Sequence, residues 1–292
     1  MFKKIILSFV LYAIFSFQVI ASEDRALFWR VDSGAATVYL FGSIHFANDS
    51  FYPLRAEIER AFDASENLVV EVDMNSPGAT ERFQHLMQSE GSYSGNETLK
   101  DHLSKKTYEQ LQNYLNESGL SPSLVERQKP GIVVLTLAAI QAQQAGLKPE
   151  QGIDVHFMEK AKNHKKILAL ETMDEQLRIF LDIEDADLLL QDSFYALETV
   201  EEEMNAMISA WKQGDEKAMQ KLLFDDILNE NAAMISLYEQ LYFQRNIKMT
   251  ESIKSYLKLK GQYFVVVGAG HLIGNKGIVQ QLHDAGYHVV RQ

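Results

Sequence analysis

Two short motifs in this sequence place a histidine three residues after a glycine, each directly behind an apolar run. The first is GSIH, ending at His45 and preceded by VYLF, and the second is GAGH, ending at His271 and preceded by YFVVV. Runs of β-branched and aromatic residues predict buried strands, so each histidine is expected just beyond a strand end. Because glycine permits a tight turn, each imidazole is expected at the edge of a sheet.

Two glutamates have similar places relative to other predicted strands. Glu71 lies late in the run NLVVEVDM, and Glu171 ends the run KKILALE. An ionised carboxylate among buried valines is costly unless it is paired or bound, so Glu71 is the stronger functional candidate. In open α/β sheets, ligands bind at the carboxyl ends of the strands. If the four strands are parallel neighbours, the two glutamates and the two motif histidines converge on one site.

Two imidazoles with one or two carboxylates are a ligand set for first-row divalent metal ions. We expect His45 and His271 to bind the metal with help from Glu71. Such an ion would polarise a carbonyl group and lower the pKa of bound water to about 7, with Glu71 or Glu171 as general base. Without a metal, His45 and Glu71 would form an acid–base pair that activates water. Both interpretations predict hydrolysis.

Several other chemistries lack their motifs. There is no G-K-[ST] phosphate loop and no G-x-G-x-x-G that opens a helix in a βαβ unit. Neither G-x-S-x-G nor H-E-x-x-H occurs, and the absence of Cys excludes disulfides, thiol nucleophiles and Cys-based zinc sites. A non-catalytic peptide- or haem-binding protein is a further alternative, although strand-end carboxylates do not suit haem.

The predicted elements that position these residues are α/β units at both ends of the chain. ALFWRVDSGAATVYLF predicts a hairpin, and YPLRAEIERAFDAS has apolar residues at helical spacing. GIDVHFMEKAKNH predicts another helix, which Asp154 could cap. Near the C-terminus, GQYFVVVGAGHLIGNKGIVQQLHDAGYHVV predicts a strand, a glycine turn, a helix and a strand.

Between these units the sequence is mainly helical, over about residues 76–146 and again over about 173–260. We therefore expect an α/β (α+β) fold: a central mixed sheet formed by the N- and C-terminal parts, flanked by helices, with a large helical insertion in the middle. No linker rich in Gly, Ser or Pro divides the chain, so residues 22–292 are expected to form a single domain.

The first 21 residues have the layout of a secretory signal: a basic start, an apolar stretch, and small residues before Ser22. The apolar stretch is shorter than the roughly 20 residues that span a bilayer. We therefore expect cleavage and export to the periplasm or the exterior, with no stable membrane span afterwards. The formal net charge of −12 disfavours nucleic acid as a partner, which favours a peptide or small-molecule substrate. The sequence does not indicate the oligomeric state.

Several of these segments together resemble the TraB/GumN family, which includes the Tiki-type proteases of animals. The segments are YLFGSIHFAND, LVVEVDM, GIDVHFMEKAK, ILALETMDEQL, the pair RN at 245–246, and VVVGAGHLIGNKGIVQQLHDAGYHV. The resemblance implies an α/β core with a helical insertion, distantly similar to erythromycin-esterase-like and ChaN-like proteins.

The resemblance also implies a divalent-metal-dependent hydrolase, with manganese or cobalt supporting peptide cleavage in the Tiki branch. Together with the ligand set, this leads us to expect a peptide substrate and manganese, cobalt or zinc as the cofactor. The residues that match the family's motifs are, in chain order, His45, Glu71, Glu171, Arg245, Asn246 and His271. A solvated helix face would also explain Arg245, but the resemblance favours a site role, in which Arg245 orients substrate or stabilises developing charge. We expect Asn246 and Asp154 to contact substrate or to support the metal ligands.

Overall fold

The computed structural model describes residues 26–183, 185–225, 228 and 234–292 of the 292-residue chain. The predicted secretory signal, residues 1–21, therefore lies outside the described residues. None of the helices within the described ranges is both long enough and apolar enough to cross a membrane.

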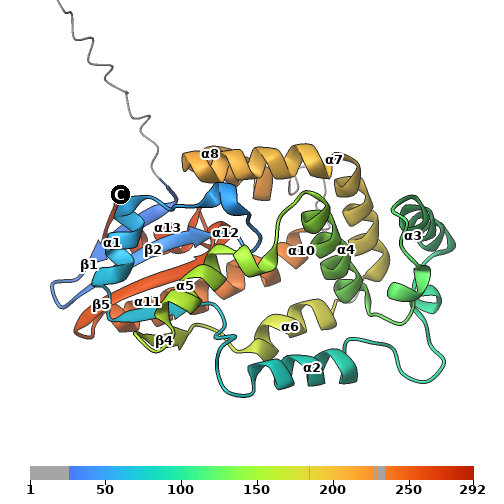
Figure 1. The fold of residues 1–292 in the computed structure, drawn as a ribbon, viewed down its shortest axis with the longest axis horizontal. Helices are drawn as coiled ribbons and strands as arrows, with labels where there is room; N and C mark the ends of the chain where they lie inside the picture. The colour runs from blue at the N-terminus through green and yellow to red at the C-terminus, as the bar shows by residue number, and fades with distance from the viewer. Residues whose placement is uncertain (1–25, 184, 226–227, 229–233) are drawn as a thin grey trace, which may run out of the picture.

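A six-stranded sheet joins the N- and C-terminal parts of the described chain (Figure 1). Its strands are β1 (Phe28–Asp32), β2 (Ala36–Ser43), β3 (Asn67–Val70), β4 (Lys166–Ala169), β5 (Gly261–Gly268) and β6 (His288–Arg291). Their order is β4-β3-β5-β2-β1-β6, so β5 lies between two strands from the N-terminal part. β4, β3, β5 and β2 are parallel, whereas β1 pairs antiparallel with β2 and β6. The predicted mixed sheet and its N-terminal hairpin are confirmed.

The inner parallel strands β2, β3 and β5 are largely buried because helices cover both faces of the sheet, whereas the edge strand β4 is partly exposed. Within β5, every residue from Tyr263 to Val267 is at most 5% exposed, as expected for a strand covered on both faces. Figure 1 shows α1 (Ala56–Ala64) and α5 (Ile153–Ala161) in front of the sheet. α11 (Gln244–Leu257) and α13 (Ile278–Asp284) contact each other and cover the opposite face, as right-handed crossovers require.

The remaining helices form a helical part beside the sheet (Figure 1). They are α2 (Ala79–Ser89), α3 (Lys105–Glu117), α4 (Pro130–Gln144), α6 (Met173–Leu181), α7 (Ala186–Gln213) and α10 (Ile235–Tyr238). The short α8 (Glu216–Gln220) lies above the sheet in Figure 1, and α12 (Ala269–Leu272) follows β5. The 3₁₀ turns are η1 (Asp49–Phe51), η2 (Leu99–His102), η3 (Pro122–Leu124) and η4 (Pro149–Gln151), and the π-helical turns are η5 (Lys221–Asp225) and η7 (Glu239–Phe243).

The helical part has apolar cores of its own. α4 consists mostly of apolar residues and contacts α6 and α7, although Leu135 is 37% exposed. Two apolar clusters in this part, one around Leu111 and one around Leu177, are distinct from the large core around the sheet. The mainly helical character predicted for about 76–146 and 173–260 is confirmed over the described residues.

The carboxyl ends of the four parallel strands meet at one edge of the sheet, as predicted. β2 and β5 are direct neighbours, with Ser43 opposite Gly268, and β3 pairs with both β5 and β4. His45 follows the end of β2, Glu71 follows β3 directly, and Glu171 follows β4 by one intervening residue. The prediction that Glu71 lies inside its strand is wrong by one position, because strand pairing ends one residue earlier.

The two G-x-x-H motifs have different local structures. Gly42 lies inside β2, so the tight turn predicted there is wrong. Its small size serves close packing instead, because a Cβ would lie 3.1 Å from atoms of both Leu27 and Ala269. Gly268 ends β5 and precedes α12, and this short helix contains His271. One histidine therefore lies on a loop after a strand, and the other on a helix.

Candidate active site

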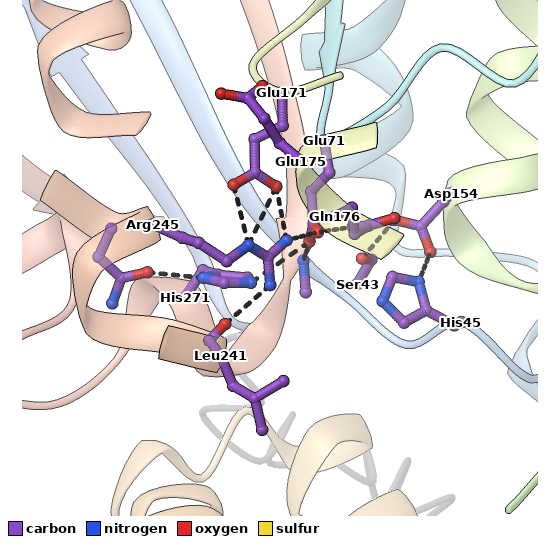
Figure 2. A network of polar contacts seen from close by, with 12 residues as sticks. Ser43, His45, Glu71, Asp154, Glu171, Glu175, Gln176, Leu241, Arg245 and His271 are labelled. Carbon is purple, nitrogen blue, oxygen red and sulfur yellow. Dashed lines mark hydrogen bonds and ion pairs between the residues drawn. The ribbon is translucent and has the colours of Figure 1, made fainter. Parts of the chain in front are cut away.

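His45 is held by a carboxylate behind its ring (Figure 2). Its Nδ1 lies 2.8 Å from Asp154 Oδ2, and Ser43 Oγ donates a 2.6 Å hydrogen bond to the other oxygen of that carboxylate. Asp154 lies in the first turn of α5, whose N-cap is Gly152. The predicted capping role of Asp154 is therefore wrong, since its side chain reaches the loop after β2 instead. With Nδ1 bound, only Nε2 of His45 is free to bind a ligand.

The pair formed by His45 and Asp154 favours a charged imidazole. The Asp154 carboxylate raises the pKa of His45 to about 9. Because 59% of the His45 side chain is exposed, solvent screens the ion pair and limits its contribution to stability. In the protein without a metal, the ring carries a proton at neutral pH.

His271 is the buried member of the histidine pair, at 3% exposed. Its Nδ1 lies 2.6 Å from Asn246 Oδ1, and Asn246 Nδ2 donates a 2.9 Å hydrogen bond to the carbonyl oxygen of Lys276. This amide orientation places the ring proton on Nδ1 and leaves a lone pair on Nε2, 3.7 Å from Glu71 Oε1. Burial lowers the pKa of His271 to about 4, so the ring is neutral at neutral pH.

Glu71 is buried and held through both oxygens. Oε1 accepts the backbone N–H of Gly268 at 2.7 Å, and Oε2 accepts from Gln176 Nε2 at 3.0 Å and Arg245 Nη2 at 2.7 Å. Burial alone would raise the pKa of Glu71, but the two histidines, Arg245 and the Gly268 N–H together lower it to about 2. Because the buried histidine is neutral near pH 7, Arg245 and the exposed histidine are the cations that keep Glu71 ionised there.

Arg245 joins the two glutamates (Figure 2). Its Nε donates to both oxygens of Glu171 at 2.9 and 3.0 Å, and its Nη2 donates to Glu171 Oε2 at 2.7 Å as well as to Glu71. Its Nη1 donates to the carbonyl oxygen of Leu241 at 2.8 Å. A planar guanidinium suits this multiple pairing. These contacts assign Arg245 to holding the two carboxylates, and Glu171 to holding Arg245.

The two histidines and Glu71 surround the end of β5. A Cβ on Gly268 would lie 3.3 Å from Glu71 Oε1, 3.6 Å from His271 Cδ2 and 3.7 Å from His45 Nε2. Glycine leaves the space between the three side chains open, which a larger residue would fill. The residues predicted from the sequence therefore lie around one point, with Asp154 and Asn246 behind the two rings.

The donor chemistry of this cluster suits a divalent metal. Imidazoles whose Nδ1 atoms are held by a carboxylate and an amide, beside an ionised carboxylate, are typical ligands with typical supporting contacts. The 3.7 Å between His271 Nε2 and Glu71 Oε1 is close to the roughly 3.3 Å between two ligands on a tetrahedral ion with bonds of about 2.0–2.1 Å. Within the described ranges, however, no three His, Cys, Asp or Glu side chains are gathered closely enough to hold an ion. A third ligand would therefore have to move toward the other two. His45 is the exposed member of the set, so it is the ligand expected to move.

Sequence reasoning missed three residues of this neighbourhood. Ser43 lies inside the first motif and orients its carboxylate partner, and Gln176 on α6 donates to a site glutamate. Tyr242 packs against His271, with ring centroids 5.3 Å apart. Tyr242 precedes Arg245 by three residues, so helical spacing from that arginine could have found it. For the other two, the sequence alone carries no comparable signal.

Comparison with known proteins agrees with the resemblance seen in the motifs. A model of the TraB/PrgY/gumN family matches residues 27–291. The chain is 30% identical to an uncharacterized protein, YbaP, of Escherichia coli (strain K12) over 246 residues, which cover 84% of this chain and 87% of that protein. YbaP of Shigella flexneri matches to the same extent. No solved structure shows a significant match. Since the family model spans both G-x-x-H motifs and the segments between them, this chain belongs to the TraB/PrgY/gumN family.

Proposed function

We propose that this protein is a hydrolase that binds a divalent metal ion beside Gly268 and cleaves peptide bonds. One observation carries the proposal: both motif histidines have Nδ1 fixed from behind. Neither Nε2 has a hydrogen-bond partner among the described residues, and both lie near the same buried glutamate. Rings fixed in this way are prepared to bind a ligand through Nε2.

In this proposal His45 and His271 supply Nε2, and Glu71 supplies Oε1, to manganese, cobalt or zinc. The bound ion would polarise the scissile carbonyl and lower the pKa of water to about 7. The pKa of about 2 suits Glu71 as a ligand better than as a general base, because a base works best with a pKa near the operating pH.

The other polar residues position the three ligands. Asp154 and Asn246 fix the orientation of the two rings. Arg245 and Gln176 bind Oε2 of Glu71, which leaves Oε1 facing the buried histidine. These residues act through the ligands, so we assign them positioning roles.

A second candidate is a metal-free hydrolase, such as an esterase-like enzyme. His45 has a raised pKa and His271 a lowered one, and environments that separate two pKa values are typical of acid–base pairs. His45, protonated at neutral pH, would then donate a proton to the leaving group, and the neutral His271 would orient the attacking water through Nε2. In this version Glu71 orients and stabilises the two rings, since its low pKa makes it a weak base.

A single set of assays separates these candidates. Mature protein purified without a His tag is stripped with EDTA and reloaded with manganese, cobalt or zinc. Hydrolysis is then measured on a pool of fluorogenic peptides and on p-nitrophenyl butyrate, with His45→Ala and His271→Ala as matched variants. The proposal predicts peptide cleavage that EDTA abolishes, that a metal restores, and that both variants lack. Activity that survives EDTA favours the metal-free candidate, and no activity in any loaded form contradicts hydrolysis.

We also propose that the protein is exported, on the basis of the signal-like residues 1–21. In a Gram-negative host, the mass of the protein recovered from the periplasm or the medium should correspond to a chain that begins at Ser22. Full-length protein confined to the cytoplasm would contradict export.

A further inference from the structure

The space beside the histidines extends to both sides of His45. One cavity, which we name the larger cavity, has a volume of about 560 Å³, and a second, the smaller cavity, has a volume of about 260 Å³. Both are lined by His45, Phe46, Glu71 and Gln176. His45 and Glu71 therefore lie where the two cavities meet, whereas His271 lines the larger cavity alone.

Apolar side chains from different elements line the two cavities. The larger cavity is lined by Leu135 of α4, Phe180 of α6, Met207 of α7, Leu223 of η5 and Tyr242 of η7. The smaller cavity is lined by Val72 and Met74 after β3 and by Val155 and Met158 of α5. Each cavity can therefore bury an apolar group, and apart from Phe46, which lines both, the apolar side chains around the two cavities are different.

The charged groups that line the cavities are already engaged. Arg245 is paired with two glutamates, and Asp154 accepts hydrogen bonds from Ser43 and His45. A terminal ammonium or carboxylate is commonly recognised by a charged side chain that pairs with it. Among the described lining residues we find no unengaged charge of this kind outside the proposed metal ligands, so a bound chain is expected to pass through both cavities rather than end in one.

We propose, building on the hydrolase function proposed above, that the substrate is an extended peptide with a bulky apolar side chain on each side of the scissile bond. Cleavage is internal: the oxygen of water bonds to the carbonyl carbon, the C–N bond breaks, and the leaving amine takes a proton from the water. One flanking side chain occupies the larger cavity and the other occupies the smaller cavity.

Leu135 and Met74 provide a matched pair of test positions. They line the larger and the smaller cavity respectively, and they are 37% and 42% exposed, so Leu135→Asp and Met74→Asp should leave the fold intact. Each variant places a carboxylate against one apolar subsite and spares the other. Each is therefore the control for its counterpart.

The experiment uses four internally quenched peptides with blocked ends and manganese-loaded protein. The peptides differ only in the two central residues, which are Leu-Leu, Leu-Ser, Ser-Leu or Ser-Ser. Leu-Leu should be cut fastest, at the central bond, and each mixed peptide about tenfold more slowly, because one apolar contact is worth about that much in specificity. Leu135→Asp should slow one mixed peptide about tenfold, and Met74→Asp the other. Equal rates on all four peptides, or a requirement for a free chain end, would overturn the inference while hydrolysis itself stands.

A binding measurement separates this inference from the proposed function. Fluorescein-labelled versions of the four peptides are titrated with the wild-type protein and His45→Ala, and fluorescence anisotropy is recorded. Tighter binding of Leu-Leu than Ser-Ser without any cleavage would support the two apolar subsites and contradict the hydrolase. Equal binding of Leu-Leu and Ser-Ser would contradict the subsites. Cleavage of acyl esters by a protein that neither binds nor cuts the peptides would overturn the peptide substrate.

Discussion

Replacing Arg245 with methionine should destabilise the protein strongly. The side chains of Arg245, Glu71 and Glu171 are 12%, 7% and 5% exposed, and the guanidinium lies 2.7 Å from an oxygen of each carboxylate. Methionine keeps the apolar stem but leaves two buried carboxylates without their cation. Breaking a buried ion pair in this way costs about 3–5 kcal/mol.

In a thermal melt this loss should be large. One kcal/mol corresponds to roughly 2–4 °C in a domain of this size class, so Arg245→Met should lower Tm by about 6–20 °C. The assay is a circular dichroism melt in metal-free buffer. Glu171→Gln serves as the partner in a double-mutant cycle, because it removes one carboxylate charge with little change in shape.

The sign of the Glu171→Gln effect is the decisive result. In the wild type this change should lower Tm, because it weakens the pairing with Arg245. In the Arg245→Met background it should raise Tm, because it removes one of two unpaired charges. If Glu171→Gln shifts Tm equally in both backgrounds, the two residues are not coupled, and the ion network between Arg245 and the two glutamates is refuted.

Further predictions concern the ligands and one helix end. Asp154→Asn should weaken manganese binding about 10–100-fold in isothermal titration, since His45 loses its charged partner; unchanged affinity would contradict that role. The backbone φ of Gly268 is −49°, which alanine also adopts, so Gly268→Ala should change Tm little. Its Cβ would lie 3.3 Å from Glu71 Oε1, so the affinity for the metal should fall. Glu175 accepts a backbone N–H at the start of α6, which lowers the pKa of Glu175 from 4.5. The ionised carboxylate therefore stabilises the folded protein above pH 4.5, and this stabilisation is lost as the pH falls below that value and Glu175 becomes protonated. Wild type and Glu175→Gln should therefore differ in Tm at neutral pH and converge in strong acid, and a difference that persists in acid would refute this.

Much of the site could be predicted because its residues lie just after apolar strands. A run such as YFVVV indicates a strand, and the residues at the carboxyl end of a parallel strand lie at the ligand-binding edge of the sheet. The adjacency of β2 and β5 then brings His45 near His271, although these residues are far apart in the sequence. Strand order itself is not written in any local pattern, so the meeting of the two motifs required the structure.

Long-range side-chain pairing set the limit of prediction. Asp154 has the position of a helix-capping residue, yet its partner is His45, 109 residues away. A local signal for a helix start gives no information about such a contact, which depends on how α5 packs beside β2. Likewise, Glu171, the partner of Arg245, lies 74 residues away. The residue types were predictable, and their roles depended on their partners.

The metal content of the purified protein tests the proposed metal site most directly. Mature protein without a His tag is examined by elemental mass spectrometry beside His45→Ala and His271→Ala, each shown to be folded by circular dichroism. We expect close to one transition-metal ion per chain in the wild type and its loss in both variants. No bound metal in the wild type, even after reloading with manganese, cobalt or zinc, would contradict the metal-dependent hydrolase.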